Sequence, residues 1–488
     1  MPPTSYTDYA AIQALSDPCF KGLKRYMRRK ATHSSRIAVI DYAQNGSLES
    51  NHKPTVLGDC NIGDIVNQPA ADTMRLLLIE DINPQIIIAL VEAFDINPIF
   101  FAEYVNLKIL DVEKDAGSQS LTTLPSSKSG EEYFHLPYQQ VLDLGSAELC
   151  HDMKNALHTE SNIPRDIENL ASLSGRQFGL AHATCSIMIK KFDTYSICLI
   201  LLDPSVTHAV EATRAGRRRR YPANSLPAGF EESELRRSMT SFKDIQAYLD
   251  GTSMLDNLLH YFQTPTFPGD LTATSVISHF CRYPIIVVLT HWNLYIRLVD
   301  RFSKHYKHSL EDTKSQLDNH HILNILRWIR QIRQRRHRLT ILSESVNFRI
   351  QQGSDTMTWQ LLLSDITELQ DQLQDYSQLF EEMFILNRLM VQHLDSGRSI
   401  FVDVNVYIAI LFVPMSFFTS MFSMSMYDLP NDKELWICIS TTLLFLVPAI
   451  VLLALYQEVV QALEDIYLES IRVYKSAYLS SFTQQEMV

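Results

Sequence analysis

The sequence predicts an α+β cytosolic domain, then long helices, and finally a C-terminal two-helix transmembrane hairpin. Residues 1–230 hold short apolar runs rich in Ile, Val and Leu, and helical periodicity takes over after about residue 232. Two longer apolar runs lie near the C-terminus: 400–422 has a single carboxylate, and 435–456 has no charged residue. A helix of either length spans roughly 33 Å, enough to cross a hydrocarbon core of about 30 Å.

Composition limits the class of protein. Lys and Arg number 43 against 55 Asp and Glu, a net charge of −12, so general affinity for nucleic acid is not expected. The seven cysteines form no CxxC pair, which favours a reducing compartment. The N-terminus carries no secretory signal pattern, and Arg388 and Arg398 precede the first apolar run. We therefore expect a two-pass membrane protein with both termini cytosolic, in the plasma membrane or alternatively a mitochondrial or vacuolar membrane.

The N-terminal domain contains four recognisable elements. Residues 35–42 (SRIAVIDY) and 75–80 (RLLLIE) have the composition of strands. Residues 81–101 predict one helix that begins at an Asn-Pro pair and ends at a second one. Residues 178–203 hold two apolar runs and predict a hairpin at the edge of the sheet, while 110–132 has the composition of a surface loop.

Two basic stretches each allow two interpretations. The run 217–220 (RRRR) lies among Gly, Pro, Asn and Ser and is either a solvated loop or a nuclear or anionic-lipid signal. The helical segments that follow are expected near 235–262, 270–310 and 314–350. The third carries a strongly basic stretch, 326–338, which is either a solvated helix face or a cationic surface beside the membrane or an acidic partner helix.

The most regular stretch is a 4-3 repeat of large side chains. Such a repeat predicts helix packed against helix, and a single polar residue in it can fix the register. Its members are Leu362, Ile366, Leu369, Leu373, Tyr376, Phe380, Met383, Asn387, Met390 and Leu394. We expect one helix of roughly seventy residues, about 100 Å long, that begins near Asp355 and continues through the first apolar run.

These patterns predict six segments. They are an N-terminal α/β cytosolic domain (1–230), a helical leg region (231–353), a stalk helix that continues into the first transmembrane helix (354–425), an acidic outer loop (426–434), the second transmembrane helix (435–456) and an amphipathic tail (457–488).

One stripe of the first predicted span is lined by small or polar residues. Its members are Ser399, Val402, Val406, Ala409, Val413, Ser416 and Ser420, with Asn405 beside them. The stripe is either a helix-packing face or the wall of a narrow water path. It continues toward the stalk as Asp395, Gln392 and Arg388, and this continuation favours a funnel that leads to a pore. Asp403 adds a carboxylate inside the span.

The loop between the two apolar runs is acidic. Asp428, Asp432 and Glu434 would concentrate cations at a pore mouth if several copies surround one axis. A single copy would make an ordinary polar loop.

The segment 412–425 (FVPMSFFTSMFSMS) resembles the end of the first membrane helix in the CorA divalent-metal transporters, where a similar segment leads to Tyr-Gly-Met-Asn. The segment LLLIEDINPQ…AFDINPIFFAEY is similar to the N-terminal domain of fungal CorA-like members. The resemblance implies a pentameric funnel in membrane lipid, with the first helices around the pore. It also implies a divalent cation, Mg²⁺ first, as transported ion and regulator, with no organic cofactor.

The resemblance places the family's Gly-Met-Asn signature on Ser423, Met424 and Ser425, so only the Met is retained. A hydroxyl in place of the amide shortens the ring of groups that would hold the waters of a hydrated ion. The expected function is a homopentameric channel for divalent cations, and the alternative is a non-conducting membrane-anchored sensor or scaffold. No P-loop, GxSxG or HExxH motif is present, so an enzyme is not expected. No residue is assigned as a fixed metal ligand.

Overall fold

The structure is a computed structural model of the whole chain. It describes residues 6–16, 20–43, 55–57, 62–67, 69–70, 73–106, 132–148, 156–212, 218–226, 253–263, 273–311, 319–351 and 359–388, together with Phe412, Ser416, Trp436 and Ser440. The chain divides into two compact units, 1–387 and 388–488. The sheet and the long helices described below belong to the first unit.

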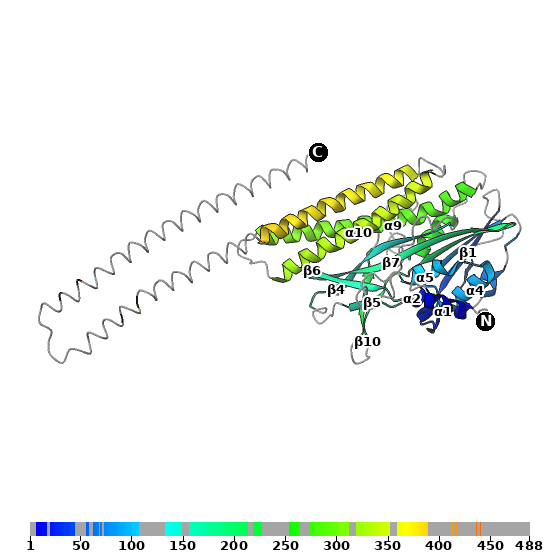
Figure 1. Ribbon diagram of the computed structural model, residues 1–488, viewed down its shortest axis with the longest axis horizontal. Coiled ribbons are helices and arrows are strands. Elements are labelled where there is room, and N and C mark those ends of the chain that lie inside the picture. Colours follow the sequence, from blue (N-terminus) through cyan, green and yellow to red (C-terminus); the bar gives the residue numbers. More distant parts are fainter. Residues whose placement is uncertain are drawn as a thin grey trace, which may run out of the picture. The chain divides into compact units, whose positions relative to one another are not determined.

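The described strands form one eleven-stranded sheet in the order β10-β9-β5-β6-β7-β8-β3-β1-β2, and β4 pairs with both β7 and β11 (Figure 1). Neighbouring strands are antiparallel except β3 and β8, which are parallel. The strand bounds are β1 Arg36–Ala43, β2 Thr55–Leu57, β3 Thr73–Glu80, β4 Glu132–Ser146, β5 Ala156–Thr159, β6 Asp166–Leu173, β7 Arg176–Lys191, β8 Tyr195–Leu202, β9 His208–Ala212, β10 Arg218–Pro222 and β11 Asn224–Ser225.

Helices flank the sheet. The helix bounds are α1 Tyr6–Ser16, α2 Phe20–Met27, α3 Ile62–Val66, α4 Pro84–Phe94, α5 Pro98–Asn106, α8 Met254–Gln263, α9 Ala273–Glu311 and α10 Asn319–Gln351. Residues 359–388 form a further helix, which we call the seam helix because it carries the 4-3 repeat.

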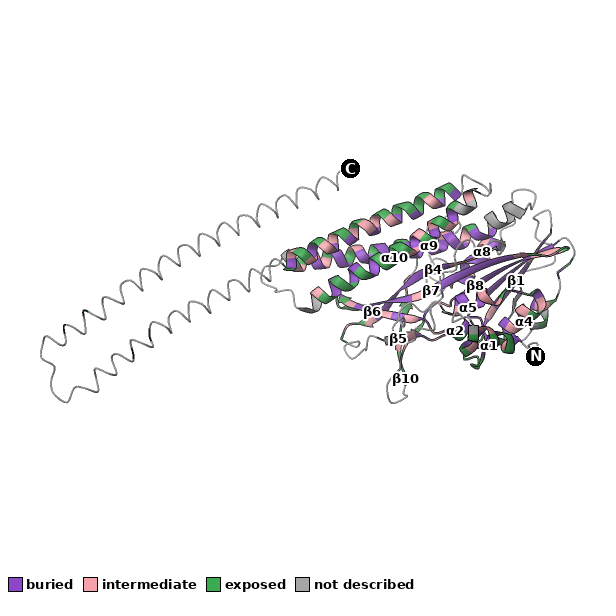
Figure 2. Cartoon of the chain, viewed as in Figure 1, coloured by how far each residue is buried: buried purple, intermediate pink, exposed green. Residues whose placement is uncertain are grey.

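Both faces of the sheet are buried, and strand β3 shows how. Leu76 and Leu78 join the core formed with α8, α9, α10 and the seam helix. Leu77 and Ile79 point the other way, into the core formed with α1, α2, α4 and α5. Successive side chains on a strand alternate between faces, so a strand covered on both sides must be apolar throughout. Figure 2 shows the buried strands between the two helical layers.

The seam helix buries the predicted repeat. The buried positions are Leu362, Ile366, Leu369, Leu373, Phe380, Met383 and Asn387. Tyr376 is half-buried, and its hydroxyl donates to Asp300 Oδ1 on α9 at 3.2 Å. The ring of Phe380 stacks on the ring of Trp328 of α10, with the two ring centroids 6.1 Å apart. Helix-on-helix packing is thus confirmed over 359–387, whereas Met390 and Leu394 lie outside the described residues.

The predicted single helix over residues 81–101 is two helices. Asn83 begins α4 by accepting the Ile86 amide at 2.9 Å, and α4 ends at Asp95, which has a left-handed φ of 45°. The second Asn-Pro pair, expected to end the helix, begins α5 instead, because Pro is well suited to the first turn.

Two other expectations require correction. The hairpin predicted at 178–203 exists as β7 and β8, but it lies in the middle of the sheet rather than at its edge. Burial on both faces explains why its runs are apolar throughout rather than alternating. Arg218, Arg219 and Arg220 belong to the outer strand β10 rather than to a loop, and Arg220 forms an ion pair with Glu160. Residues 110–131 lie outside the described part.

The predicted spans 400–422 and 435–456 lie outside the described residues, apart from Phe412, Ser416, Trp436 and Ser440. In the part of the chain that the structure describes, no helix is both long enough and apolar enough to cross a bilayer.

Candidate functional site

The most polar part of the fold lies where the two parallel strands end. Strands β3 and β8 pair in register up to Glu80 and Leu202, and each is followed at once by an aspartate, Asp81 or Asp203. The carboxyl ends of parallel strands in one sheet form a shared edge, where side chains from different segments meet. The Asp81 amide donates to the Leu202 carbonyl at 3.0 Å, which draws the two strand ends together.

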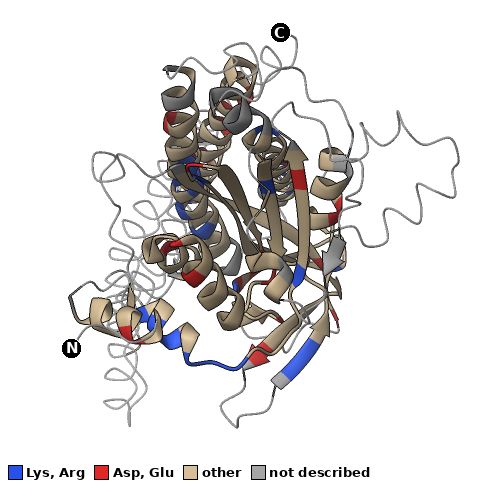
Figure 3. Ribbon diagram, turned by 90° about the vertical axis from the view of Figure 1, so that its right-hand side faces the viewer, with Lys and Arg blue, Asp and Glu red and all other residues tan. Residues whose placement is uncertain are grey.

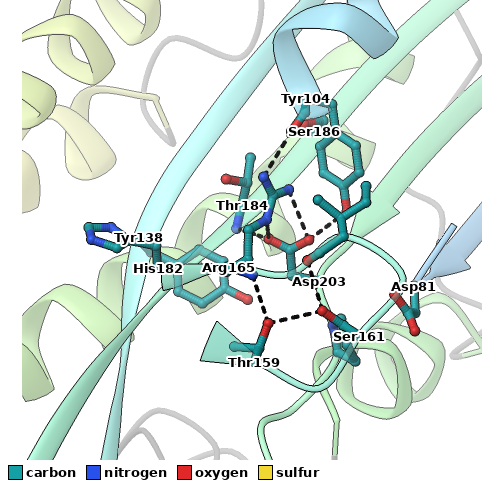
Figure 4. Close-up of polar contacts among 12 residues, drawn as sticks. Asp81, Tyr104, Tyr138, Thr159, Ser161, Arg165, His182, Thr184, Ser186 and Asp203 are labelled. Atoms are coloured by element: carbon teal, nitrogen blue, oxygen red, sulfur yellow. Dashed lines mark hydrogen bonds and ion pairs between the residues drawn. The ribbon is translucent and has the colours of Figure 1, made fainter. Parts of the chain in front are cut away.

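Asp203 is held by a buried arginine (Figure 4). Arg165 donates through Nε to Asp203 Oδ2 at 2.9 Å and through Nη2 to Oδ1 at 3.0 Å. The two side chains are only 5% and 6% exposed. A two-bond contact between Arg and carboxylate is the geometry best able to offset the cost of burying both charges.

Further partners complete this ion pair. The Tyr104 hydroxyl donates to Asp203 Oδ1 at 2.8 Å, and the Thr184 amide donates to Oδ2 at 2.8 Å. Arg165 also donates through Nη1 to the Tyr104 carbonyl at 3.0 Å, and its guanidinium carbon lies 5.0 Å from the centre of the Tyr104 ring. Each carboxylate oxygen of Asp203 therefore accepts two hydrogen bonds, which fills its capacity and leaves no position for a metal ion.

Asn162 connects the strand ends to the segment before β1. Its backbone amide donates to Asp81 Oδ1 at 2.9 Å, and its Nδ2 donates to the Asp81 and His33 carbonyls at 3.0 Å each. Its Oδ1 accepts the amides of Thr32 and His33 at 2.9 and 3.0 Å. One side chain thereby ties the N-terminal segment and the β5–β6 loop to the end of β3.

Asp81 has unusual electrostatics. Burial raises its pKa to about 7, and the nearby carboxylates of Asp203 and Glu80 add to the rise, while the Asn162 amide and Arg165 oppose it. Its backbone lies in the left-handed region with φ 56°, which Asp and Asn tolerate better than most residues. Asp81 is thus a buried carboxyl group that can change protonation near neutral pH.

A second polar cluster joins helix α10 to strand β6 and helix α9. Arg335 donates to Glu168 Oε2 on β6 at 3.1 Å and to the Tyr295 hydroxyl on α9 at 2.7 Å. Gln331 also donates to Glu168. On β7, burial lowers the pKa of His182 to about 3, with Arg338 and Arg335 adding to the effect. The basic stretch predicted on this helix is thus partly structural, because Arg335 points inward.

Neither of these two described clusters has the arrangement of a metal site. Within the described ranges, no three His, Cys, Asp or Glu side chains are grouped so that they could hold a metal ion. The charged groups of the strand-end cluster are bonded to one another, so the cluster fixes the positions of loops and strand ends. It is a structural centre in which burial raises the pKa of one member, Asp81, to about 7.

The predicted pore residues are almost all outside the described part of the chain. Within the span only Ser416 of these residues is described, and at the stalk end only Arg388 is; both are helical and exposed in the single chain. The positions outside are Asp395, Ser399, Val402, Asn405, Ala409, Val413 and Ser420 of the stripe, Ser423, Met424 and Ser425 of the signature, and Asp428, Asp432 and Glu434 of the loop. Their arrangement remains a prediction.

Sequence reasoning did not predict the strand-end cluster. A signal for half of it was present, because an aspartate directly follows each of the apolar runs LLLIE and LILL. Arg165 and Asn162 lie in a loop with no periodicity or motif, so nothing local marks them. Their roles follow only from the topology that brings β3 and β8 together.

Comparisons with known proteins give structural neighbours only. No family model matches the chain, and no curated protein matches it. It is similar to the CorA magnesium transporter from Methanocaldococcus jannaschii (10% identity, 87% of this chain and 98% of that chain, TM-score 0.44). It is also similar to the ZntB cytoplasmic domain from Vibrio parahaemolyticus (11%, 72% and 98%, TM-score 0.28) and to the full-length CmaX protein (12%, 86% and 97%, TM-score 0.34). At these TM-scores the matches do not establish a family for this chain.

Proposed function

We propose that this chain forms a CorA-like homopentameric membrane channel for divalent metal cations, with Mg²⁺ as the first ion to test. The observation that carries the proposal is the C-terminal pair of apolar runs, 400–422 and 435–456. The first run ends in a segment that resembles the end of the family's pore helix. A two-helix hairpin cannot enclose a path alone, so conduction requires several copies around one axis.

The described fold supports this reading. An α+β body is followed by long helices, of which α10 and the seam helix are antiparallel. The seam helix is the last of them and leads in sequence directly toward the first apolar run. Its buried 4-3 repeat makes it a stiff element packed on α9 and α10. A stiff helix next to a span is suited to carry a conformational change from the cytosolic body to a pore.

In this proposal the stripe residues form successive rings. Asp395, Ser399, Asn405, Ser416, Ser420 and Ser425 would present carboxylate, amide and hydroxyl oxygens, which are the ligands that hard divalent cations and their waters accept. Asp428, Asp432 and Glu434 would raise the cation concentration at the mouth. The protein would lie in the membrane with both termini in the cytosol.

The test is cation flux through purified full-length protein in liposomes, measured with a trapped Mg²⁺ indicator, together with the mass of the detergent-solubilised particle. Val413→Phe adds bulk on the predicted pore stripe, and we expect it to abolish flux. Leu411→Phe adds an aromatic ring on another face of the same helix and should leave flux unchanged. A monomeric or dimeric particle, or equal effects of the two variants, would contradict the proposal.

A second function is favoured by one observation. Ser423 and Ser425 replace the Gly and Asn of the family's signature, which leaves room for a scaffold or sensor that no longer conducts. A pentameric particle that passes no divalent cation under any metal condition would support this alternative. Flux that appears only after the double change Ser423→Gly and Ser425→Asn would support it further.

A further inference from the structure

Two neighbouring helices of the bundle have opposite charge. Helix α10 contains seven arginines and one glutamate over 319–351. The seam helix contains six acidic residues over 359–387 and no Lys or Arg in that range. Figure 3 colours the Lys and Arg positions blue and the Asp and Glu positions red on the ribbon. Only some of these charged side chains form ion pairs within the described part of the chain, such as Arg333 with Glu381 and Arg335 with Glu168.

On α10 a continuous row of residues faces away from the bundle. The row follows helical spacing and has a basic centre with apolar ends, since Leu323 is 63% and Ile341 45% exposed. We call it the basic face. Its members are Leu323, Arg327, Arg330, Gln334, His337 and Ile341, all exposed. Arg327 and Arg330 form no ion pair with any other residue that the structure describes.

The seam helix has a matching exposed row with an acidic centre and apolar ends. Leu361 is 60% and Ile385 is 54% exposed, although leucine and isoleucine are normally buried. We call this row the acidic face. Its members are Leu361, Asp365, Glu368, Asp371, Asp375, Glu382 and Ile385, all exposed.

Contacts inside the chain join the two helices along a different line. Arg333 donates to Glu381 at 2.8 Å, Arg336 donates to Gln374, and Gln370 donates to Thr340 at 3.4 Å. Residue numbers rise along one helix as they fall along the other, so the helices are antiparallel. These contacts lie beside the two faces and leave both faces open.

We infer that the basic face of α10 in one copy of the chain packs against the acidic face of the seam helix in the next copy. A contact between two different surfaces is heterologous and closes into a ring when the rotation allows it. The inference rests on the proposed function only for the number of copies in that ring. At 1.5 Å per residue, the basic face (323–341) is about 27 Å long and the acidic face (361–385) is about 36 Å long. The basic face therefore fits within the length of the acidic face.

The residue order selects one register. Copies that share a ring axis along the bundle point the same way, so the two helices meet antiparallel between copies as well. Placing Ile341 opposite Leu361 sets apolar against apolar. It then sets His337 opposite Asp365, Gln334 opposite Glu368, Arg330 opposite Asp371 and Arg327 opposite Asp375, with no like charges facing each other. The in-chain contacts have another register, in which Gln334 lies level with residue 378.

Cross-linking tests the register. Two differently tagged full-length chains are co-expressed, one with Gln334→Cys and the other with Glu368→Cys, and the membranes are treated with a short bismaleimide. We expect a product that carries both tags, because only a contact between copies can join the two chains. The matched control replaces Glu368→Cys with Glu382→Cys, on the same face but about 21 Å further along the helix, and should give little product.

Reversing the charges tests whether attraction between the two faces causes the contact between copies. Reversing the basic face (Arg327→Glu with Arg330→Glu), or reversing the acidic face (Asp371→Arg with Asp375→Arg), should lower the cross-linked product about tenfold, because like charges then meet. Both reversals in every chain should restore it, which a role in folding alone would not do. Near-ultraviolet circular dichroism of each purified variant confirms that it folds.

The outcomes separate this inference from the proposed function. Flux and a pentameric mass without a product above the Glu382→Cys control would overturn the inference and leave the channel standing. A specific product that charge exchange restores, from a particle that passes no cation, would support the inference and count against conduction. A monomeric particle would overturn both.

Discussion

The strand-end cluster and the charged helix faces use the same residue types in opposite ways. At the strand ends, Arg165 and Asp203 are almost fully buried, and their hydrogen-bonding groups are paired within one chain. On the bundle, Arg327 and Arg330 are exposed and form no ion pair among the described residues. A buried charge is tolerated only when an opposite charge and hydrogen bonds satisfy it within the fold. An exposed charge is solvated by water and can later pair with a charge on a second molecule. The first region therefore stabilises the fold, and the second is available for assembly.

The largest expected effect comes from removing the buried guanidinium. Arg165→Gln should lower the free energy of unfolding by about 3–5 kcal/mol, because it leaves the Asp203 carboxylate buried without its counter-charge. Arg330→Gln makes the same change at an exposed position and should cost less than about 0.5 kcal/mol. Thermal and urea unfolding of the full chain in detergent measure both. Equal losses would show that the two regions do not differ as we argue.

A double variant sharpens this result. Removing both charges, with Arg165→Met and Asp203→Leu, should cost less than Arg165→Gln alone, because no unpaired charge remains. The single variants Arg165→Met and Asp203→Leu complete the comparison. A double variant that is less stable than the native protein by the sum of the two single losses would instead indicate that the two side chains are not coupled beyond packing.

The seam helix allows a comparison between its own two faces. Leu373 is fully buried in the repeat, and Leu361 is exposed on the acidic face. Leu373→Ala should lower the free energy of unfolding by about 3 kcal/mol, through lost apolar burial and the cavity left behind. Leu361→Ala should change it by less than about 0.5 kcal/mol, yet reduce the Gln334–Glu368 cross-link. Similar losses of stability from both would mean that Leu361 is already covered within one chain.

Asp81 should give the strand-end cluster a pH dependence near neutrality. Its pKa of about 7 in the folded protein lies above that of an unfolded Asp, so the folded state holds the extra proton at low pH and stability falls as pH rises. Between pH 6 and pH 8 the native protein should lose about 1.4 kcal/mol more than Asp81→Asn, which keeps the left-handed backbone and an acceptor oxygen. Urea unfolding at the two pH values measures the difference.

The control for this substitution is Asp95→Asn, because Asp95 also lies in the left-handed region but its side chain is exposed. Native protein and Asp81→Asn with equal pH slopes would contradict the assignment of the titrating group.

Elements that depend on local pattern could be predicted from the sequence, and those that depend on topology could not. The 4-3 repeat predicts the burial of Leu373 and Phe380, because helix periodicity fixes which side chains share a face. The apolar runs that became β3, β7 and β8 predict strands, but not that β7 and β8 lie in the middle of the sheet. The Arg165–Asp203 pair joins residues 38 positions apart, and no local preference of either residue marks it. The second Asn-Pro pair is compatible with either end of a helix, because Pro both starts and stops helices, and only the packing of α5 decides between these roles.

The smallest expected effect concerns these two Asn-Pro pairs. Asn83 and Asn97 each accept a backbone amide at the start of a helix, at 2.9 Å from Ile86 and 3.1 Å from Ile99. Asn83 is buried beside the strand-end cluster and Asn97 is exposed, so water can replace the lost acceptor only at Asn97. Asn83→Ala should therefore cost about 1 kcal/mol or more and Asn97→Ala about 0.5 kcal/mol, with Asn83→Ser close to the native protein because Ser also caps well and adds no buried charge. If Asn97→Ala proved the more harmful in thermal unfolding, burial next to Asp81 would not be what gives the first cap its importance.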